Sequence, residues 1–294
     1  MKNGEINMSK KGYIYTGIIA IIVVVIGAAH FLSNNSQKAS KNHVQVINVA
    51  GVADNHPYTY ADGNKIGGYD GELLRKLDAD LPQYKFKYST TSQNSLFVGL
   101  SSGKYDIASS GFWYSSKRAQ QYLFSNPTAI ADLRLVYRSN EKKINSFTDI
   151  AKRNLKLAPI SSDDARYNFI EQYNKDNPKN KVNLSAIGDI SSGDALKQLQ
   201  EKQFDAVFYP YQAFIGVQKA GGAKGLSVSP SIGVKNDYIV ASKNDKNKQL
   251  LDAINKDLKK LKEDGYLDKL SKKWLGEDTF KLPHAEENFK NNKG

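Results

Sequence analysis

Short apolar strands alternate with amphipathic helices along nearly all of the sequence after residue 43, and this alternation restricts the fold more than any other feature. Val44–Val49 has the composition of a buried strand, and Gly71–Leu81 follows it with its leucines on one helical face. A strand at Lys85–Tyr88, a helix at Asn94–Ser101 and a strand at Tyr105–Ala108 come next. Such alternation predicts an α/β fold with mainly parallel sheets that carry helices on both faces.

The same alternation continues through the second half of the chain. Strands are expected at five further places: Leu133–Tyr137, Leu155–Ala158, Val182–Ile187, Phe204–Phe208 and Tyr238–Ala241. Further helices are expected at Ser146–Lys152, from Ser161 or Ser162 to about Asn174, at Asp194–Lys202, at Gln212–Ala220 and in a long segment that stops at Gly265. At 294 residues, the chain has room for about two domains of ordinary size besides a short anchor.

The N-terminal part contains an apolar segment, Ile14–Leu32, that reaches the ~20 residues a helix needs to cross a bilayer. Lysines precede this segment, so the positive-inside rule predicts residues 1–12 in the cytoplasm, a transmembrane anchor at 13–32 and the rest outside. A cleavable signal peptide is the alternative, because Gly27–Ala29 offers small residues at a cleavage site. A polar linker is expected at 33–43 and a charged tail at 277–294.

The charge and the cysteine content exclude several classes of partner. The formal net charge is +12, but the lysines are spread along the chain, which is typical of a solvated surface beside an anionic envelope. We therefore expect no nucleic-acid partner. The sequence contains no cysteine, which excludes disulfides, a lipid-modified cysteine and cysteine metal sites, and its four histidines have no metal-ligand spacing. We expect neither a metal nor another cofactor.

The run from Gly103 to Pro127 gives the clearest indication of a binding site. The expected strand Tyr105–Ala108 ends in a Ser/Gly turn, and a short loop then carries Arg118 beyond the C-terminal end of that strand. Open α/β sheets bind ligands at this end of their strands. Arginine suits a carboxylate because it donates two parallel hydrogen bonds. The run therefore predicts a site for a ligand that carries a carboxylate.

An ordered set of short motifs resembles the extracellular solute-binding proteins of amino-acid-type ABC importers, bacterial solute-binding protein family 3. The set covers roughly Ile47–Gly276 and includes Pro57–Tyr60, Gly67–Leu73, Leu96–Leu100, Gly103–Asp106, Arg118, Phe124–Ser125, Phe204–Val207, Asp264–Gly265 and Lys273–Gly276. The resemblance implies a two-lobed α/β fold of the periplasmic-binding-protein-like type II, with lobes joined by two hinge strands. Lobe 1 would comprise 44–137 plus 239–276 and lobe 2 would comprise 138–238, with the ligand between lobes that close by a hinge motion.

The resemblance also assigns roles to residues of the expected lobe 1. Arg118 matches the arginine that holds the carboxylate of the ligand. Gly111 matches the glycine whose carbonyl group faces the amino group of the ligand. Trp113 stands where the family usually has a small hydroxyl residue, so it either floors the pocket under an apolar or cationic part of the ligand or packs between the lobes.

Two positions depart from the family pattern, one at the acid that holds the ammonium of the ligand and one at an aromatic residue that stacks on the ligand. The family usually has an acid a few residues after the strand that matches Phe204–Phe208, whereas this chain has Tyr209 and Pro210 there. We take Tyr209 as a candidate ligand contact. An aromatic residue often stacks on the ligand just before the short helix that precedes Gly103, and this chain has Gln93 at the matching place.

A third departure replaces the glycine-rich turn of lobe 2 with the segment from Ser161 to Asp164. This segment resembles a self-satisfied helix cap. The alternative is that Asp163 or Asp164 replaces the missing acid and receives an ammonium or other cationic group. Asp54 is a weaker candidate for that role.

Together these features predict an extracytoplasmic substrate-binding component of an ABC transporter, with ABC permease subunits as partners. The protein is expected at the cell membrane through its N-terminal helix, or secreted after signal cleavage. The departures favour an amino acid relative such as a cystine-like compound, a modified amino acid or a small peptide. We expect no enzymatic activity, and the alternatives are a ligand-binding receptor not coupled to import and a dehydratase-like enzyme on the same scaffold.

Overall fold

The fold is described from a computed structural model, which places residues 44–162, 164–186, 192–282 and 285. The segments predicted at 1–12, 13–32 and 33–43, and most of the tail predicted at 277–294, lie outside the described residues. Within the described part, no helix combines the length and the apolar character that crossing a membrane requires.

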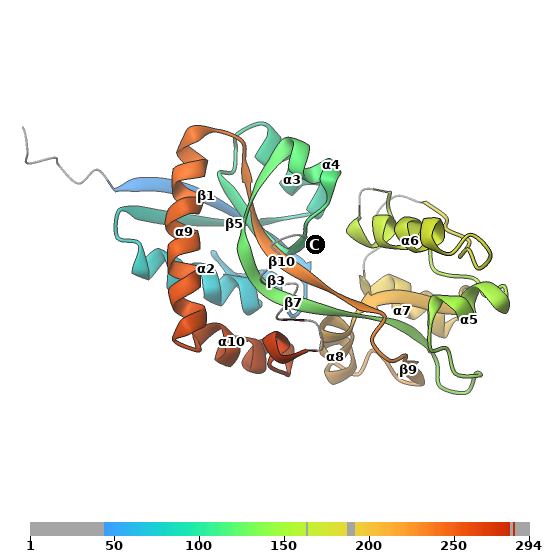
Figure 1. Ribbon diagram of the computed structural model, residues 1–294. Coiled ribbons are helices and arrows are strands. Elements are labelled where there is room, and N and C mark those ends of the chain that lie inside the picture. The colour runs from blue at the N-terminus through green and yellow to red at the C-terminus, as the bar shows by residue number, and fades with distance from the viewer. Residues whose placement is uncertain (1–43, 163, 187–191, 283–284, 286–294) are drawn as a thin grey trace, which may run out of the picture. The chain divides into compact units, whose positions relative to one another are not determined.

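A seven-stranded sheet runs through the described part in the strand order β5–β1–β6–β10–β7–β8, and β9 pairs with β7 (Figure 1). Its strands are β1 (Gln45–Val52), β5 (Tyr84–Thr91), β6 (Ile107–Trp113), β7 (Tyr122–Arg138), β8 (Ala206–Pro210), β9 (Leu226–Val228) and β10 (Gly233–Ser242). A small three-stranded sheet consists of β2 (Asp54–Asn55), β3 (Thr59–Asp62) and β4 (Lys65–Gly67).

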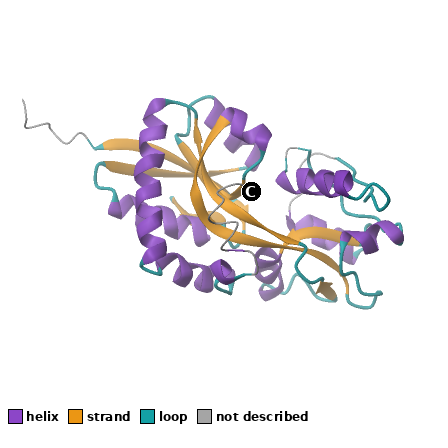
Figure 2. Cartoon of the chain, viewed as in Figure 1, coloured by secondary structure: helices purple, strands orange, loops and turns teal. Residues whose placement is uncertain are grey.

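Helices lie in most of the segments between the strands of the seven-stranded sheet, and further helices follow β10 (Figure 2). They are α2 (Gly68–Asp80), α3 (Gln93–Ser101), α4 (Ser116–Gln121), α5 (Phe147–Lys152), α6 (Ala165–Asp176), α7 (Ser192–Gln200), α8 (Tyr211–Lys219), α9 (Asp245–Glu263), α10 (Tyr266–Leu275) and the 3₁₀ turn η1 (Thr279–Lys281). The predicted stop at Gly265 is confirmed, because α9 ends just before this glycine, whose φ of 70° lies in the left-handed region that favours glycine.

The expectation of mainly parallel sheets is wrong. β1 is parallel to β5 and β6, but the pairs β10–β6, β10–β7, β7–β8 and β7–β9 are antiparallel. The reason is that β7 and β10 are long strands of 17 and 10 residues that pair with each other and serve as the centre of the sheet. Figure 1 shows them side by side in green and orange.

Two predicted strands of the second half are not regular strands. Leu157 forms only an isolated parallel bridge with Ala206. Residues 182–186 are not in a strand, and Ile187 lies outside the described residues. At Val182 the amide N–H donates to Asn174 Oδ1 at 2.8 Å and the carbonyl accepts from Asn174 Nδ2 at 2.9 Å. A side chain of α6 therefore takes the bonds that a neighbouring strand would have made.

The alternation of side chains along β10 joins the helices to both faces of the sheet. Ile239 and Ala241 pack into the cluster that contains the apolar faces of α2 and α9. Val240 points to the opposite face and packs with Leu96 and Leu100 of α3. Because successive side chains of a strand face opposite sides, one strand anchors two helical layers.

The C-terminal half of β7 organises a second set of helices in the same way. Leu133 and Leu135 pack with the apolar side chains of α5 and α6. Val136 lies on the other face, in the cluster that includes side chains of α7 and α8. The long strands β7 and β10 therefore run from one helix-covered part of the sheet to the other, which gives the two-lobed α/β arrangement.

Candidate functional site

A cavity of about 90 Å³ lies between the C-terminal part of β6 and the start of α6, and we call it the inner cavity. Its lining comes from both helix-covered parts of the sheet and consists of Asn55, Tyr58, Gln93, Ser110, Gly111, Phe112, Trp113, Arg118, Asp164, Ala165, Arg166, Pro210 and Ala213. Of the predicted site residues, Gln93, Gly111, Trp113, Arg118 and Asp164 therefore meet in one place.

Arg118 reaches the inner cavity from a short helix, and the expectation that it lies in a loop is wrong. The helix α4 begins after Ser115, whose hydroxyl group accepts a hydrogen bond from the amide N–H of Arg118. The guanidinium carbon of Arg118 lies 4.7 Å from the ring centroid of Phe97, and its Nη1 donates to the carbonyl of Trp113 at 3.4 Å. These contacts orient a half-buried guanidinium group toward the cavity.

Gly111 forms part of the cavity wall through its backbone. The strand that was expected to end at this turn continues to Trp113, and Gly111 adopts φ 60° inside it. A Cβ atom at this position would lie 2.9 Å from Cδ1 of the Tyr58 ring. Only glycine therefore fits both the left-handed conformation and the close approach of the ring. The Tyr58 hydroxyl group is buried and has no hydrogen-bond partner among the described residues.

A buried carboxyl group supports Gly111 from behind. Asp70 of α2 accepts a hydrogen bond from the Gly111 amide at 3.0 Å and another from the Ser109 hydroxyl at 2.5 Å. Burial raises the pKa of Asp70 to about 7, and the two hydrogen bonds act in the opposite direction. The carboxyl group thus ties the wall of the cavity to the core of the first lobe.

Trp113 is held by a second buried carboxyl group. Its indole Nε1 donates to Asp237 Oδ1 of β10 at 2.8 Å. Burial and the neighbouring charge of Asp70 hold the pKa of Asp237 well above its usual range. Trp113 is 6% exposed and packs in a buried apolar cluster, and it also lines the inner cavity.

The opposite wall of the cavity contains a carboxylate that is neutralised within its own helix. Asp164 caps α6 by accepting from the amide of Arg166 at 2.8 Å, so the cap is Asp164 and not Ser161 or Ser162. The Arg166 side chain donates to both Asp164 oxygens, at 3.1 and 2.7 Å. Burial alone would raise the pKa of Asp164, but the charge and hydrogen bonds of Arg166 and the charge of Arg118 hold it below its usual range.

Three other predicted site residues, Asp54, Tyr209 and Ser161, do not line the inner cavity. Asp54 has a side chain that is 87% exposed and lies 4.0 Å from His56 Nε2. Tyr209 is buried in the core on β8, which pairs with β7, and it does not belong to the lining. Ser161 is partly buried and does not belong to the lining, and Asp163 lies outside the described residues.

Several lining residues were missed by the sequence analysis. Arg166 is the most important, because it brings a second guanidinium group to the cavity. Its position two residues after Asp164 was the signal that was available, since an arginine in the first turn of a helix pairs readily with a capping acid. Tyr58 lies within one of the family motifs, and Asn55 reaches the cavity by donating to the Ser110 carbonyl at 3.0 Å.

The described lining of the cavity offers no donor set for a metal ion. In the described ranges, no three His, Asp or Glu side chains lie close enough together to hold one. Among the described residues, the polar groups of the inner cavity are guanidinium, amide, hydroxyl and indole groups with one paired carboxylate, which suits the recognition of an anionic or zwitterionic organic molecule.

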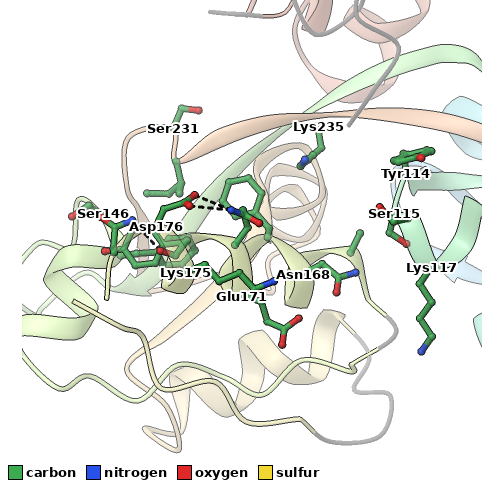
Figure 3. Close-up of a pocket in the computed structure, with 18 of the residues that line it drawn as sticks. Tyr114, Ser115, Lys117, Ser146, Asn168, Glu171, Lys175, Asp176, Ser231 and Lys235 are labelled. Atoms are coloured by element: carbon green, nitrogen blue, oxygen red, sulfur yellow. Dashed lines mark hydrogen bonds between the residues drawn. The ribbon is translucent and has the colours of Figure 1, made fainter. Parts of the chain in front are cut away.

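Figure 3 shows residues that line a second, larger groove of about 780 Å³. This groove adjoins the inner cavity, because Ala165 lines both. One side of this outer groove is formed by the segment from Tyr114 to Lys117, and the other by α5, α6 and the start of β10. Figure 3 shows Lys235 extending from β10 on the side of α6. Ligand pockets usually have volumes of roughly 300–1,000 Å³, so the groove has the size of a ligand site and the inner cavity is smaller than one.

The fold and the cleft define a solute-binding protein of the two-lobed α/β class. The sequence profile of bacterial extracellular solute-binding proteins, family 3, matches residues 47–277, and the chain belongs to this family. The resemblance seen in the sequence motifs is therefore confirmed, as is the function of a substrate-binding component of an amino-acid-type ABC transporter at the level of the family.

Individual relatives point in the same direction. The L-cystine-binding protein TcyK of Bacillus subtilis is 28% identical over 269 residues, which cover 90% of this chain and 96% of the relative. The L-cystine-binding protein TcyA of the same organism is 27% identical over 239 residues, with 80% and 83% covered. A solved chain from work on glutathione import in Gram-positive bacteria via GshT and the cystine ABC importer TcyBC of Streptococcus mutans is 29% identical with a TM-score of 0.70, covering 83% of this chain and 99% of that one.

Proposed function

We propose that the protein binds a small amino-acid-derived solute in the cleft formed by the inner cavity and the outer groove, and delivers it to ABC permease subunits. The carboxylate of the solute binds Arg118. The observation that carries this proposal is the guanidinium group of Arg118, which α4 and the Phe97 ring hold in a cavity lined by both lobes. The relatives that bind L-cystine, and the solved chain from work on glutathione import, favour a cystine-like compound or small peptide as the solute.

The environment of Arg118 supports a role in ligand recognition more than in catalysis. Asp164, a predicted candidate for receiving a cationic group, has both oxygens bonded to Arg166. A general acid or base requires a proton-transferring group within reach of the substrate, and a carboxylate held below its usual pKa by an arginine is a poor base. We therefore propose that the cleft binds its solute without converting it.

We further propose the lobe boundaries and the location of the chain. Lobe 1 comprises 44–137 with 239–276 and lobe 2 comprises 138–238, because β7 and β10 cross between the two helix-covered parts of the sheet. The apolar segment at 13–32 anchors the protein to the membrane with the lobes on the extracellular side. Release of the full chain from membranes by high salt, without detergent, would contradict the anchor.

A thermal-shift screen tests the binding proposal directly. The full chain is heated with L-cystine, glutathione, di- and tripeptides, free amino acids and small carboxylates without an amino group. A solute present at 100 times its dissociation constant stabilises the folded state by ~2.7 kcal/mol, which raises the melting temperature visibly. We expect the largest shifts for cystine or glutathione. Absence of a shift with every amino-acid-derived compound would contradict the proposal.

A further inference from the structure

The inner cavity is too small to hold the solute by itself. Its volume of about 90 Å³ is well below the roughly 300–1,000 Å³ of common ligand pockets. The adjoining outer groove has about 780 Å³. A solute whose carboxylate lies on Arg118 must therefore extend past Ala165 into the groove, and the polar groups of the groove determine which solutes fit there.

Lys235 is the basic side chain best placed to act in the outer groove. It lies on β10, is partly buried and has its Nζ 5.6 Å from the ring centroid of Phe169. Burial lowers the pKa of Lys235, and no carboxylate of the described residues forms an ion pair with it. A partly buried ammonium group without an acidic partner is costly, and an anion in the groove would offset that cost.

The acidic side chains of the groove do not compensate Lys235. Asp176 accepts two hydrogen bonds from Gln172, at 3.0 and 3.1 Å, and is exposed on α6. Glu171 is also exposed to solvent on α6. Lys175 lines the groove as well but is exposed, so its charge is screened by water and contributes little to binding.

We propose that the outer groove is a second subsite, in which Lys235 binds the distal carboxylate of an elongated solute whose first carboxylate lies on Arg118. The solute class is a molecule with a carboxylate near each end, such as a disulfide-linked amino acid or a short peptide. This inference rests on the proposed function, since it assumes that Arg118 holds one end of the solute.

Isothermal titration of the full chain with two probes tests the subsite. L-cystine and glutathione carry two carboxylates, and S-methyl-L-cysteine, with one, is the reference. Lys235→Met keeps an apolar stem beside Phe169 but removes the charge, and we expect it to weaken binding of at least one two-carboxylate probe about tenfold or more. Lys235→Arg keeps the charge and should restore most of the affinity. Lys179→Met is the matched control, because Lys179 is exposed and lies outside the lining of the groove, and it should bind like the wild type.

The outcomes separate the subsite from the proposed function. The subsite is wrong if Lys235→Met binds both two-carboxylate probes as tightly as the wild type while Arg118→Ala does not bind them. It is also wrong if neither probe binds the wild type; binding of S-methyl-L-cysteine that depends on Arg118 would then leave the proposed function standing. If Lys235→Met does not fold, Lys235→Gln takes its place in the same comparison.

Discussion

The two walls of the inner cavity hold their polar groups in different ways. On the β6 wall, the buried carboxyl groups of Asp70 and Asp237 lie behind Gly111 and Trp113 and do not face an arginine. On the α6 wall, the carboxylate of Asp164 lies in the cavity lining and is neutralised by Arg166 of the same helix. The β6 wall is therefore supported by its core, whereas the α6 wall is supported by its own ion pair.

This difference determines how each wall responds to protons. Burial raises the pKa of Asp70 to about 7 and the pKa of Asp237 well above its usual range, because no cation among the described residues compensates either group. The pKa of Asp164 lies below its usual range, because the arginine outweighs the effect of burial. A carboxyl group behind the wall can thus be neutral, whereas the carboxylate in the wall is charged and paired with an arginine.

The largest expected effect is on the pH dependence of stability. Between the usual pKa of an aspartate, 3.8, and about 7, folded Asp70 keeps a proton that the unfolded chain has lost, so the free energy of unfolding falls as the pH rises. The fall attributable to Asp70 is at most about 4 kcal/mol. Asp70→Asn cannot titrate, and urea unfolding at about pH 4 and about pH 8 should show a smaller fall than in the wild type.

Asp164→Asn is the matched control from the other wall. Its lowered pKa contributes stability above the usual pKa of an aspartate that is lost as the pH falls through the folded value, so the variant should lose stability at neutral pH and little in acid. Equal slopes in the wild type and in Asp70→Asn would show that Asp70 does not keep its proton on folding.

Arg118→Ala should produce the next largest effect, on binding. The variant loses paired charge-assisted hydrogen bonds to the carboxylate of the solute, which corresponds to about 100-fold or more in affinity. Gln121→Ala, an exposed position on the same helix, is the control and should bind normally. Titration calorimetry with L-cystine measures both, and wild-type affinity in Arg118→Ala would refute the assignment of Arg118.

Arg166→Met tests the ion pair of the α6 wall. The substitution leaves the Asp164 carboxylate, whose side chain is 19% exposed, without its guanidinium partner, and we expect a loss of about 2 kcal/mol in the free energy of unfolding. Adding Asp164→Asn removes the unpaired charge and should restore part of this loss. If Arg166→Met is as stable as the wild type by urea unfolding, the wall does not depend on the pair.

Trp113→Phe should have the smallest effect. It removes the indole N–H that donates to Asp237 Oδ1, and Oδ2 already lacks a partner among the described residues. We expect a loss of about 1 kcal/mol, or roughly 2–4 °C in melting temperature. Trp113→Tyr, which keeps more of the ring volume without the indole N–H, should behave similarly. If the stability of Trp113→Phe is unchanged, the hydrogen bond from Trp113 to Asp237 does not stabilise the β6 wall.

Local sequence features predicted the helices whose positions depend on apolar periodicity and on a terminating glycine. The leucines of α2 and α9 and the glycine at 265 fix helices whose apolar faces the core requires. The antiparallel character of the sheet was not predictable in this way, because it depends on the pairing of β7 with β10, which are separated in the sequence by several other elements. The strand predicted from Val182 was wrong for a related reason. The side chain of Asn174 bonds to the backbone N–H and carbonyl of Val182, which a neighbouring strand would otherwise have paired.

The candidate site was predictable on one wall and poorly on the other. The motif around Gly111 and Arg118 indicated the β6 wall, although the helix that carries Arg118 was taken for a loop. Asn55 reaches the cavity only through tertiary packing, so no spacing in the sequence marked it. Arg166 follows a capping acid and Tyr58 lies within a family motif, but neither signal by itself indicated that the residue lines the cavity. Tyr209 was expected in the site by its place after the strand predicted at 204–208, but strand alternation turns its side chain into the core.

The most direct test of the central claim compares a solute with its amide. The compound that binds most tightly in the screen, and the same compound with its carboxylates converted to amides, are titrated into the wild type and into Arg118→Ala. If Arg118 binds the carboxylate, the wild type discriminates between the two compounds by about 100-fold and the variant discriminates far less. Equal discrimination by both proteins would show that the carboxylate is recognised elsewhere and would contradict the site described above.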